Sequence, residues 1–116
     1  MKTIRKEFLA ECHEDYVGLW SLVWTVEHET GELDPQAKRV LTIRLVTELL
    51  QSGLIKAGMP NAEGEFEAWR IGVDQIIYRI EREWDQLESD PNIGDIVWFT
   101  TTEKGDAQVK PCKPAG

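Results

Sequence analysis

The sequence has no long hydrophobic run and no start typical of a secreted protein. No apolar segment approaches the ~18 consecutive residues of a membrane-spanning helix, so we expect no contact with a membrane. The segment from Met1 to Glu7 contains bases but no continuous apolar stretch, and no site typical of signal-peptide cleavage follows it. We therefore expect no signal peptide.

Cysteine is scarce, with two residues in 116. Cys12 and Cys112 lie near opposite ends of the chain, and the sequence leaves open whether their Cα atoms come close enough for a disulfide. Two cysteines without a secretory signal favour free thiols in a reducing compartment. We therefore expect a cytoplasmic protein with unpaired thiols.

Motifs of common enzyme classes are also missing. The sequence has no Gly-x-Ser-x-Gly motif, no phosphate-binding glycine loop and no dinucleotide fingerprint. The run from Glu11 to Asp15 combines a thiol, an imidazole and three carboxylates, but adjacent side chains seldom converge on one metal ion. Cys12 beside His13 is not a catalytic dyad, because a base must be oriented toward the thiol across space. We interpret the run as an acidic cluster at a helix start, and expect no enzyme, metal or cofactor.

Basic charge is in the minority. Twenty-one acidic residues against thirteen basic ones give a formal charge of −8, whereas binding to nucleic-acid phosphates needs a basic face. Arg39 and Arg44 fall on different sides of a helix, which favours a solvated surface. We do not expect nucleic-acid binding, and keep it as an alternative. The residues of a DNA-contacting surface would be Lys38, Arg39, Thr42, Arg44 and Lys104.

The remaining composition is that of a globular protein. Hydrophobic residues make up 41% and charged residues 29% of the chain, and a chain of this length buries roughly two-thirds of its unfolded surface. We find no internal repeat and no low-complexity linker. We predict a single domain over residues 1–106 and a C-terminal tail over residues 107–116.

Three segments have the apolar periodicity of helices. The first, from about residue 14 to 29, is apolar around most of its circumference, so it is central or packed against a partner. The second follows a capping Asp34, covers residues 35–52 and stops at Gly53. The third, over residues 66–87, has apolar residues at spacings of three and four, and a break follows at 89–92.

Two segments are typical of strands. Residues 96–102 are β-branched and aromatic, and residues 54–58 form a shorter candidate. Residues 104–106 predict a turn. The order of elements predicts an α+β fold, in which three main helices carry a two-stranded β-hairpin and one helix is inserted between its strands.

Two short segments resemble parts of winged-helix regulators of the PadR and MarR types. Leu49 to Ile55 is similar to the end of a recognition helix that continues into the first wing strand, and Trp98 to Gly105 is similar to the returning wing strand with its Thr-Glu-Lys-Gly ending. The resemblance implies a winged-helix-like core. Two differences accompany it: a whole helix separates the wing strands, and we expect no helix after Gly105, where these families often place a dimerisation helix.

Tryptophan is frequent, with five residues. Tyr16, Trp20 and Trp24 stand at i, i+4 and i+8 of the first predicted helix. Packing against Trp69 and Trp84 in the core explains them, and the alternative is partner binding, since Trp and Tyr are enriched at interface hot spots. We take Tyr16, Trp20 and Trp24 as candidate partner-binding residues. The first two predicted helices also carry more apolar surface than a small core hides, which predicts a homodimer.

These observations predict a non-catalytic regulatory or protein-interaction module of winged-helix-like fold, which binds a partner protein or a second copy of itself. One alternative is a DNA-binding transcriptional regulator. Another is an acidic inhibitor or immunity-type protein that occupies a basic cleft of its partner.

Overall fold

The structure is a computed structural model that describes residues 2–87 and 96–109, with side chains from Ile4 onward. Within these ranges the chain forms five helices and four strands, in the α+β class that the sequence predicts. Cys112, the predicted break at 89–92 and residues 110–116 of the predicted tail lie outside the described residues.

The strands form one antiparallel sheet in the order β1-β4-β2-β3. They are β1 (Val17–Gly18), β2 (Ile55–Pro60), β3 (Phe66–Ala68) and β4 (Trp98–Thr101). The two predicted strands became β2 and β4, and they pair with each other as predicted, with Ala57 opposite Phe99. Two further strands were not predicted: β1 borders β4, and β3 borders β2.

The first predicted helix is wrong at its start. Helix α1 (Lys2–Glu14) ends where that helix was expected to begin, β1 follows, and α2 covers Leu19–Thr30. Gly18 is extended, with φ −80° and ψ 158°, because it pairs with Trp98 of β4. The sequence pattern favours a helix at residues 17–18, but pairing with β4 makes them a strand.

Helix α3 (Pro35–Gln51) forms as predicted. The carboxylate of Asp34 accepts a hydrogen bond from the backbone N–H of Ala37 at 2.9 Å, which caps the helix start. Gly53 follows the helix with φ +75°, a left-handed conformation that favours glycine.

The third predicted helix is correct only in its later part. Helix α4 covers Val73–Asp85, with its buried side chains at spacings of four, whereas the residues from Phe66 to Ala68 form β3. A Cβ on Gly58 would lie 2.1 Å from the carbonyl oxygen of Glu67. This glycine therefore lets β3 approach β2 closely, which the sequence periodicity does not reveal.

The predicted turn at 104–106 is wrong, because these residues belong to α5 (Glu103–Val109). The backbone N–H of Gly105 donates to the hydroxyl of Thr102 at 3.1 Å, which caps the helix start. A Cβ on Gly105 would lie 2.0 Å from the carbonyl oxygen of Leu54. The Thr-Glu-Lys-Gly segment therefore forms the start of a short helix, which packs against the residues that follow α3. The domain boundary predicted at residue 106 falls inside this helix.

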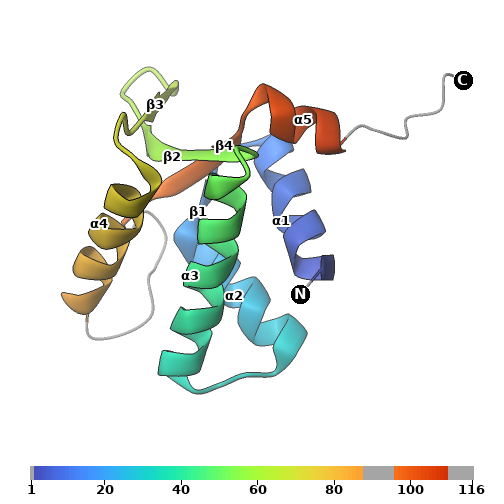
Figure 1. The fold of residues 1–116 in the computed structure, drawn as a ribbon, viewed down its shortest axis with the longest axis vertical. Helices are drawn as coiled ribbons and strands as arrows, with labels where there is room; N and C mark the ends of the chain where they lie inside the picture. Colours follow the sequence, from blue (N-terminus) through green and yellow to red (C-terminus); the bar gives the residue numbers. More distant parts are fainter. Residues whose placement is uncertain (1, 88–95, 110–116) are drawn as a thin grey trace, which may run out of the picture.

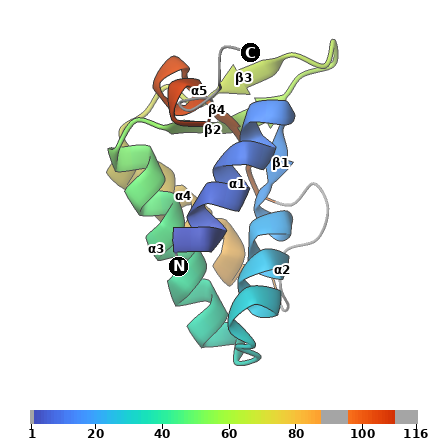
Figure 2. The same ribbon diagram turned by 90° about the vertical axis from the view of Figure 1, so that its right-hand side faces the viewer.

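The helices α1 to α4 extend from one side of the sheet (Figures 1 and 2). Their buried apolar side chains form the core, where the rings of Phe8 and Phe99 meet edge to face with centroids 5.7 Å apart. Helix α1 contacts α2, and α4 contacts α3. Helices α1 and α4 thus cover much of the apolar surface of α2 and α3 on which the homodimer prediction depends. Three large apolar side chains of α2, α3 and the loop between them stay exposed: Trp24, Leu33 and Val40.

Candidate functional site

The three candidate partner-binding residues do not form one helical stripe, because α2 begins only at Leu19. Tyr16 lies before β1, and its ring packs against Phe66 with centroids 5.1 Å apart. Trp20 lies in the first turn of α2. Trp24 is 58% exposed, and its ring stacks on His28 at 3.7 Å. The structure brings Tyr16 and Trp20 to one cavity, and places Trp24 outside it.

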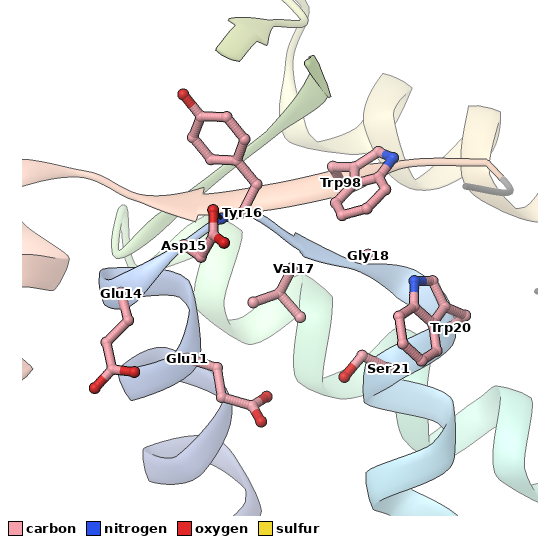
Figure 3. Close-up of a pocket in the computed structure, with 9 residues that line it drawn as sticks. All are labelled: Glu11, Glu14, Asp15, Tyr16, Val17, Gly18, Trp20, Ser21 and Trp98. Carbon is pink, nitrogen blue, oxygen red and sulfur yellow. Dashed lines mark hydrogen bonds between the residues drawn. The ribbon is translucent and has the colours of Figure 1, made fainter. Parts of the chain in front are cut away.

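This cavity has a volume of about 260 Å³ and lies where the end of α1, the strand β1 and the start of α2 meet β4 (Figure 3). We call it the acidic aromatic cavity. It is lined by three carboxylate residues, three aromatic residues and three small or aliphatic ones. They are Glu11, Glu14, Asp15, Tyr16, Trp20, Trp98, Val17, Gly18 and Ser21.

The side chains around the cavity differ in direction. The carboxylate of Glu11 and the hydroxyl of Ser21 point toward one another across the space below Val17 in Figure 3, whereas the ring of Tyr16 points to the other side of β4. Tyr16 and Val17 point to opposite sides because successive side chains of an extended segment alternate between faces. Glu11, Ser21 and Val17 therefore form the floor, and Tyr16 belongs to the rim.

Gly18 of β1 leaves room for the indole rings of Trp20 and Trp98 beside the strand. A Cβ at this position would lie 2.6 Å from both Cδ1 and Nε1 of Trp20, and 3.7 Å from Cε3 of Trp98. The backbone of Gly18 is extended, so the close ring, and not an unusual φ, requires glycine. The Nε1 atom of Trp20 is buried and has no hydrogen-bond partner in the part of the chain that the structure describes, so packing holds this ring in place there.

The electrostatics of the cavity are one-sided. None of the described residues that line it is basic. The backbone N–H of Tyr16 donates to the carboxylate of Asp15 at 2.7 Å. Partial burial, together with the nearby carboxylates of Glu7 and Glu14, raises the pKa of Glu11 above its ordinary value. A raised carboxyl pKa means that the negative charge is poorly compensated. The cavity is therefore suited to a positively charged occupant.

Two residues of the alternative DNA-contacting set are buried. Lys38 is 4% exposed and its Nζ lies 2.7 Å from a carboxylate oxygen of Glu27. Thr42 is 0% exposed. Both side chains lie under the contact between α3 and α2, so neither reaches a DNA groove in this conformation.

The other three members of that set do not share a surface. The guanidinium of Arg39 lies 2.8 Å from the carboxylate of Asp85 and 5.3 Å from the ring centroid of Trp84, both on α4. Arg44 is exposed on α3. Lys104 lies on α5, where its Nζ donates to the carbonyl oxygen of Ser52 at 2.9 Å. Helix α4 covers part of the Arg39 side chain, a contact that the sequence did not predict.

A second cavity, of about 330 Å³, carries basic residues. Arg5 and Lys6 of α1 line it together with Lys104 of α5. The Nη1 atom of Arg5 also lies 3.5 Å from a carboxylate oxygen of Glu48. The sequence does not reveal that these three bases meet, because their meeting depends on α5, where the sequence predicts a turn.

Cys12 packs in the core, and His13 contacts α5. Cys12 is 1% exposed, and burial, with a smaller contribution from Glu11, raises the pKa of its thiol far above the ordinary value. The Nδ1 atom of His13 lies 2.7 Å from a carboxylate oxygen of Asp106, and the hydroxyl of Thr101 donates to the same oxygen. This polar contact joins α1 to α5. A thiol kept protonated by burial is a poor nucleophile.

Two features are absent from the described residues. No group of three or more His, Cys, Asp and Glu side chains in ranges 2–87 and 96–109 is placed to hold a metal ion. None of the helices in the same ranges has the length and apolar character needed to cross a bilayer.

Comparison of the chain with protein-family models, with curated proteins and with solved structures found no match. The geometry and charge of the acidic aromatic cavity therefore carry the functional argument.

Proposed function

We propose that the protein is a non-catalytic interaction domain of winged-helix-like architecture, and that it binds a partner protein around the acidic aromatic cavity. The observation that carries this proposal is the cavity itself, which combines carboxylates and indoles on the outside of the domain. Aromatic side chains supply much of the binding energy at protein interfaces.

The arrangement of strands supports the winged-helix-like architecture. Strand β2 follows α3 directly, and β4 pairs with it antiparallel, as the two wing strands of the resemblance would. The strand β3 and the helix α4 form an insertion between them. Helix α5 follows β4, in the place where those regulators often have a dimerisation helix.

The insertion favours a protein partner over DNA. Helix α4 packs on α3, and it carries Glu81 and Asp85 against Arg39 with separations of 3.8 and 2.8 Å. Acidic side chains thus line the helix that would read a DNA groove, and they would repel phosphates.

The alternative of an acidic inhibitor, or immunity-type protein, is favoured by one observation. The acidic aromatic cavity has carboxylates and no basic lining residue, in a chain of formal charge −8. Such a surface attracts a basic partner and selects against an acidic one. We therefore expect the partner to be basic where it meets the cavity.

Site-specific photo-crosslinking in the native cell tests the proposal. A photoreactive amino acid replaces Glu14, at the cavity, or Tyr78, which is 66% exposed on α4 and serves as the control. We expect a protein adduct from position 14 that is absent from position 78. Equal adducts from both positions, a nucleic-acid adduct, or no adduct at position 14 would contradict the proposal.

A titration with mixed-sequence duplex DNA at low salt addresses the regulator alternative. We expect no binding, because the described bases are divided between ion pairs and separate surfaces. Saturable binding that is lost when Arg5 and Lys6 are replaced by Gln would instead assign the basic cavity to phosphate contacts.

A further inference from the structure

We propose that the acidic aromatic cavity takes one alkylammonium group, the side chain of a lysine that projects from the partner. This inference rests on the proposed function, since it names the chemistry by which the partner is bound.

The size of the cavity limits the occupant. Its volume of about 260 Å³ lies below the ~300 Å³ at which pockets for drug-sized ligands begin. A single extended side chain fits this volume, whereas a nucleotide or a bulky cofactor would extend well beyond it.

The walls of the cavity match a side chain that is apolar along its length and charged at its tip. Val17, Trp20 and Trp98 supply apolar surface, and Glu11 and Asp15 supply carboxylates. Lysine has four methylene groups below a compact ammonium, so it buries its stem while its charge stays among polar groups.

Charge complementarity favours a cation at this position. Glu11 and Glu14 lie one turn apart at the end of α1, Asp15 follows directly after the helix, and none of the described lining residues neutralises their carboxylates. The faces of the indoles of Trp20 and Trp98 carry negative electrostatic potential, which attracts an ammonium group. Burial, and to a smaller extent the carboxylates of Glu7 and Glu14, raise the pKa of Glu11. A cation beside Glu11 would offset the part that comes from the two neighbouring carboxylates.

The carboxylates around the cavity do not converge. That of Glu11 points toward the hydroxyl of Ser21, that of Glu14 points the other way (Figure 3), and that of Asp15 accepts the backbone N–H of Tyr16. The charge of the occupant therefore meets chiefly Glu11, with the hydroxyl of Ser21 beside it. An ammonium is compact and has three donors, so it can donate to both groups at the floor of the cavity.

Two-dimensional NMR of the full chain tests the inference with two small probes. The first is Nα-acetyl-lysine N-methylamide, and the second is the norleucine analogue, which has the same stem without the charge. We expect the lysine probe to shift the amide signal of Gly18 and the indole N–H signals of Trp20 and Trp98 saturably, with a dissociation constant in the millimolar range, about 1–30 mM. We expect the norleucine probe to leave these signals in place.

Variants identify the groups that bind. Glu11→Gln keeps the shape of an exposed side chain and removes one charge, and we expect it to weaken binding of the lysine probe by about 3- to 10-fold. Trp98→Leu removes one ring, with an expected loss of about 2- to 30-fold. The matched controls are Glu29→Gln, an exposed acid of α2 outside the cavity, and Trp24→Phe; both should bind like the wild type.

Three results would overturn the inference: equal shifts from both probes, no shift of the three signals in the folded wild type at about 100 mM lysine probe, or unchanged binding in Glu11→Gln. Failure here is distinguishable from failure of the proposed function. A protein adduct from position 14 together with a negative lysine titration would retain the interaction domain and remove only its lysine chemistry.

Discussion

The buried hydroxyl of Thr42 predicts both the direction and the size of a change in the free energy of unfolding. Thr42 is 0% exposed, and its Oγ1 has no hydrogen-bond partner among residues 2–87 and 96–109. Three other threonines of α2 and α3 donate their hydroxyls to the carbonyl oxygen four residues earlier: Thr25, Thr30 and Thr47. Thr42 therefore bears the cost of losing water without the usual compensation.

We expect Thr42→Val to stabilise the protein. Burial of an unpaired hydroxyl costs about 1–3 kcal/mol, and valine replaces the hydroxyl by a methyl group of similar size while keeping a β-branched side chain in α3. Allowing for imperfect packing of the new methyl, the free energy of unfolding should rise by about 1–2 kcal/mol. The midpoint of thermal unfolding should rise by roughly 3–10 °C.

Two variants of α3 serve as controls. Thr47→Val removes a hydroxyl that donates to the carbonyl oxygen of Ile43 at 2.7 Å, so it should be neutral or destabilising. Thr42→Ser keeps the unpaired hydroxyl and removes the methyl group, which should cost about 0.5–1.5 kcal/mol, the usual cost of one buried methyl. The order of stability should be Thr42→Val, wild type, Thr42→Ser.

Urea unfolding followed by tryptophan fluorescence and circular dichroism measures the effect. The slope of free energy against urea should stay constant, so that a change in midpoint reports stability alone. A Thr42→Val variant that is less stable than the wild type by more than about 0.5 kcal/mol at an unchanged slope would show that the hydroxyl has a partner in solution, and would refute the reasoning.

Four further predictions test other parts of the molecule. In a Cys112→Ser background, Cys12 should react with a thiol reagent only after unfolding, because it is 1% exposed and burial raises its pKa; fast reaction of the native protein would contradict this. The pKa of Glu11 is raised in the folded protein, so the protonated form of this side chain favours folding and its stabilising effect is lost as the pH rises through the raised value. Glu11→Gln should therefore reduce the fall in the free energy of unfolding between about pH 4 and pH 7. An unchanged pH profile of stability in this variant would contradict the prediction. Gly105→Ala places a Cβ 2.0 Å from a backbone carbonyl oxygen and should lower the unfolding free energy by about 1–3 kcal/mol, which calorimetry can check. Trp24→Asp changes a side chain that is 58% exposed, so it should convert the predicted homodimer to a folded monomer in sedimentation; a wild type that is monomeric at high micromolar concentration would remove the homodimer.

The candidate site could be predicted only in part. Aromatic spacing identified Tyr16 and Trp20, but as members of a helical stripe that the structure does not contain. The sequence predicts a helix start at the acidic run 11–15, whereas the run lies at the end of α1. The sequence also predicts a strand at Trp98 but gives no sign that its ring lines the cavity. The spacing of Ile4, Phe8, Leu9 and Cys12 was a local signal for α1, and it would have placed the run at a helix end.

The sequence by itself determined the elements whose signals are local. The capping aspartate, the proline and the following glycine set the bounds of α3, and the β-branched run set β4, because these preferences act through a residue and its near neighbours. The charge of the chain, and with it the sign of the preferred partner, is likewise a property of composition.

Only the tertiary structure decided β1, β3, α5 and the acidic aromatic cavity. A strand of two residues has no periodicity to detect, and Val17 and Gly18 become a strand because β4 offers them a pairing edge. That pairing ends α1, delays the start of α2 and places the Trp20 ring over Gly18. All lining residues except Trp98 lie between residues 11 and 21, but their arrangement depends on the pairing of β1 with β4, so long-range pairing and close packing determine the cavity.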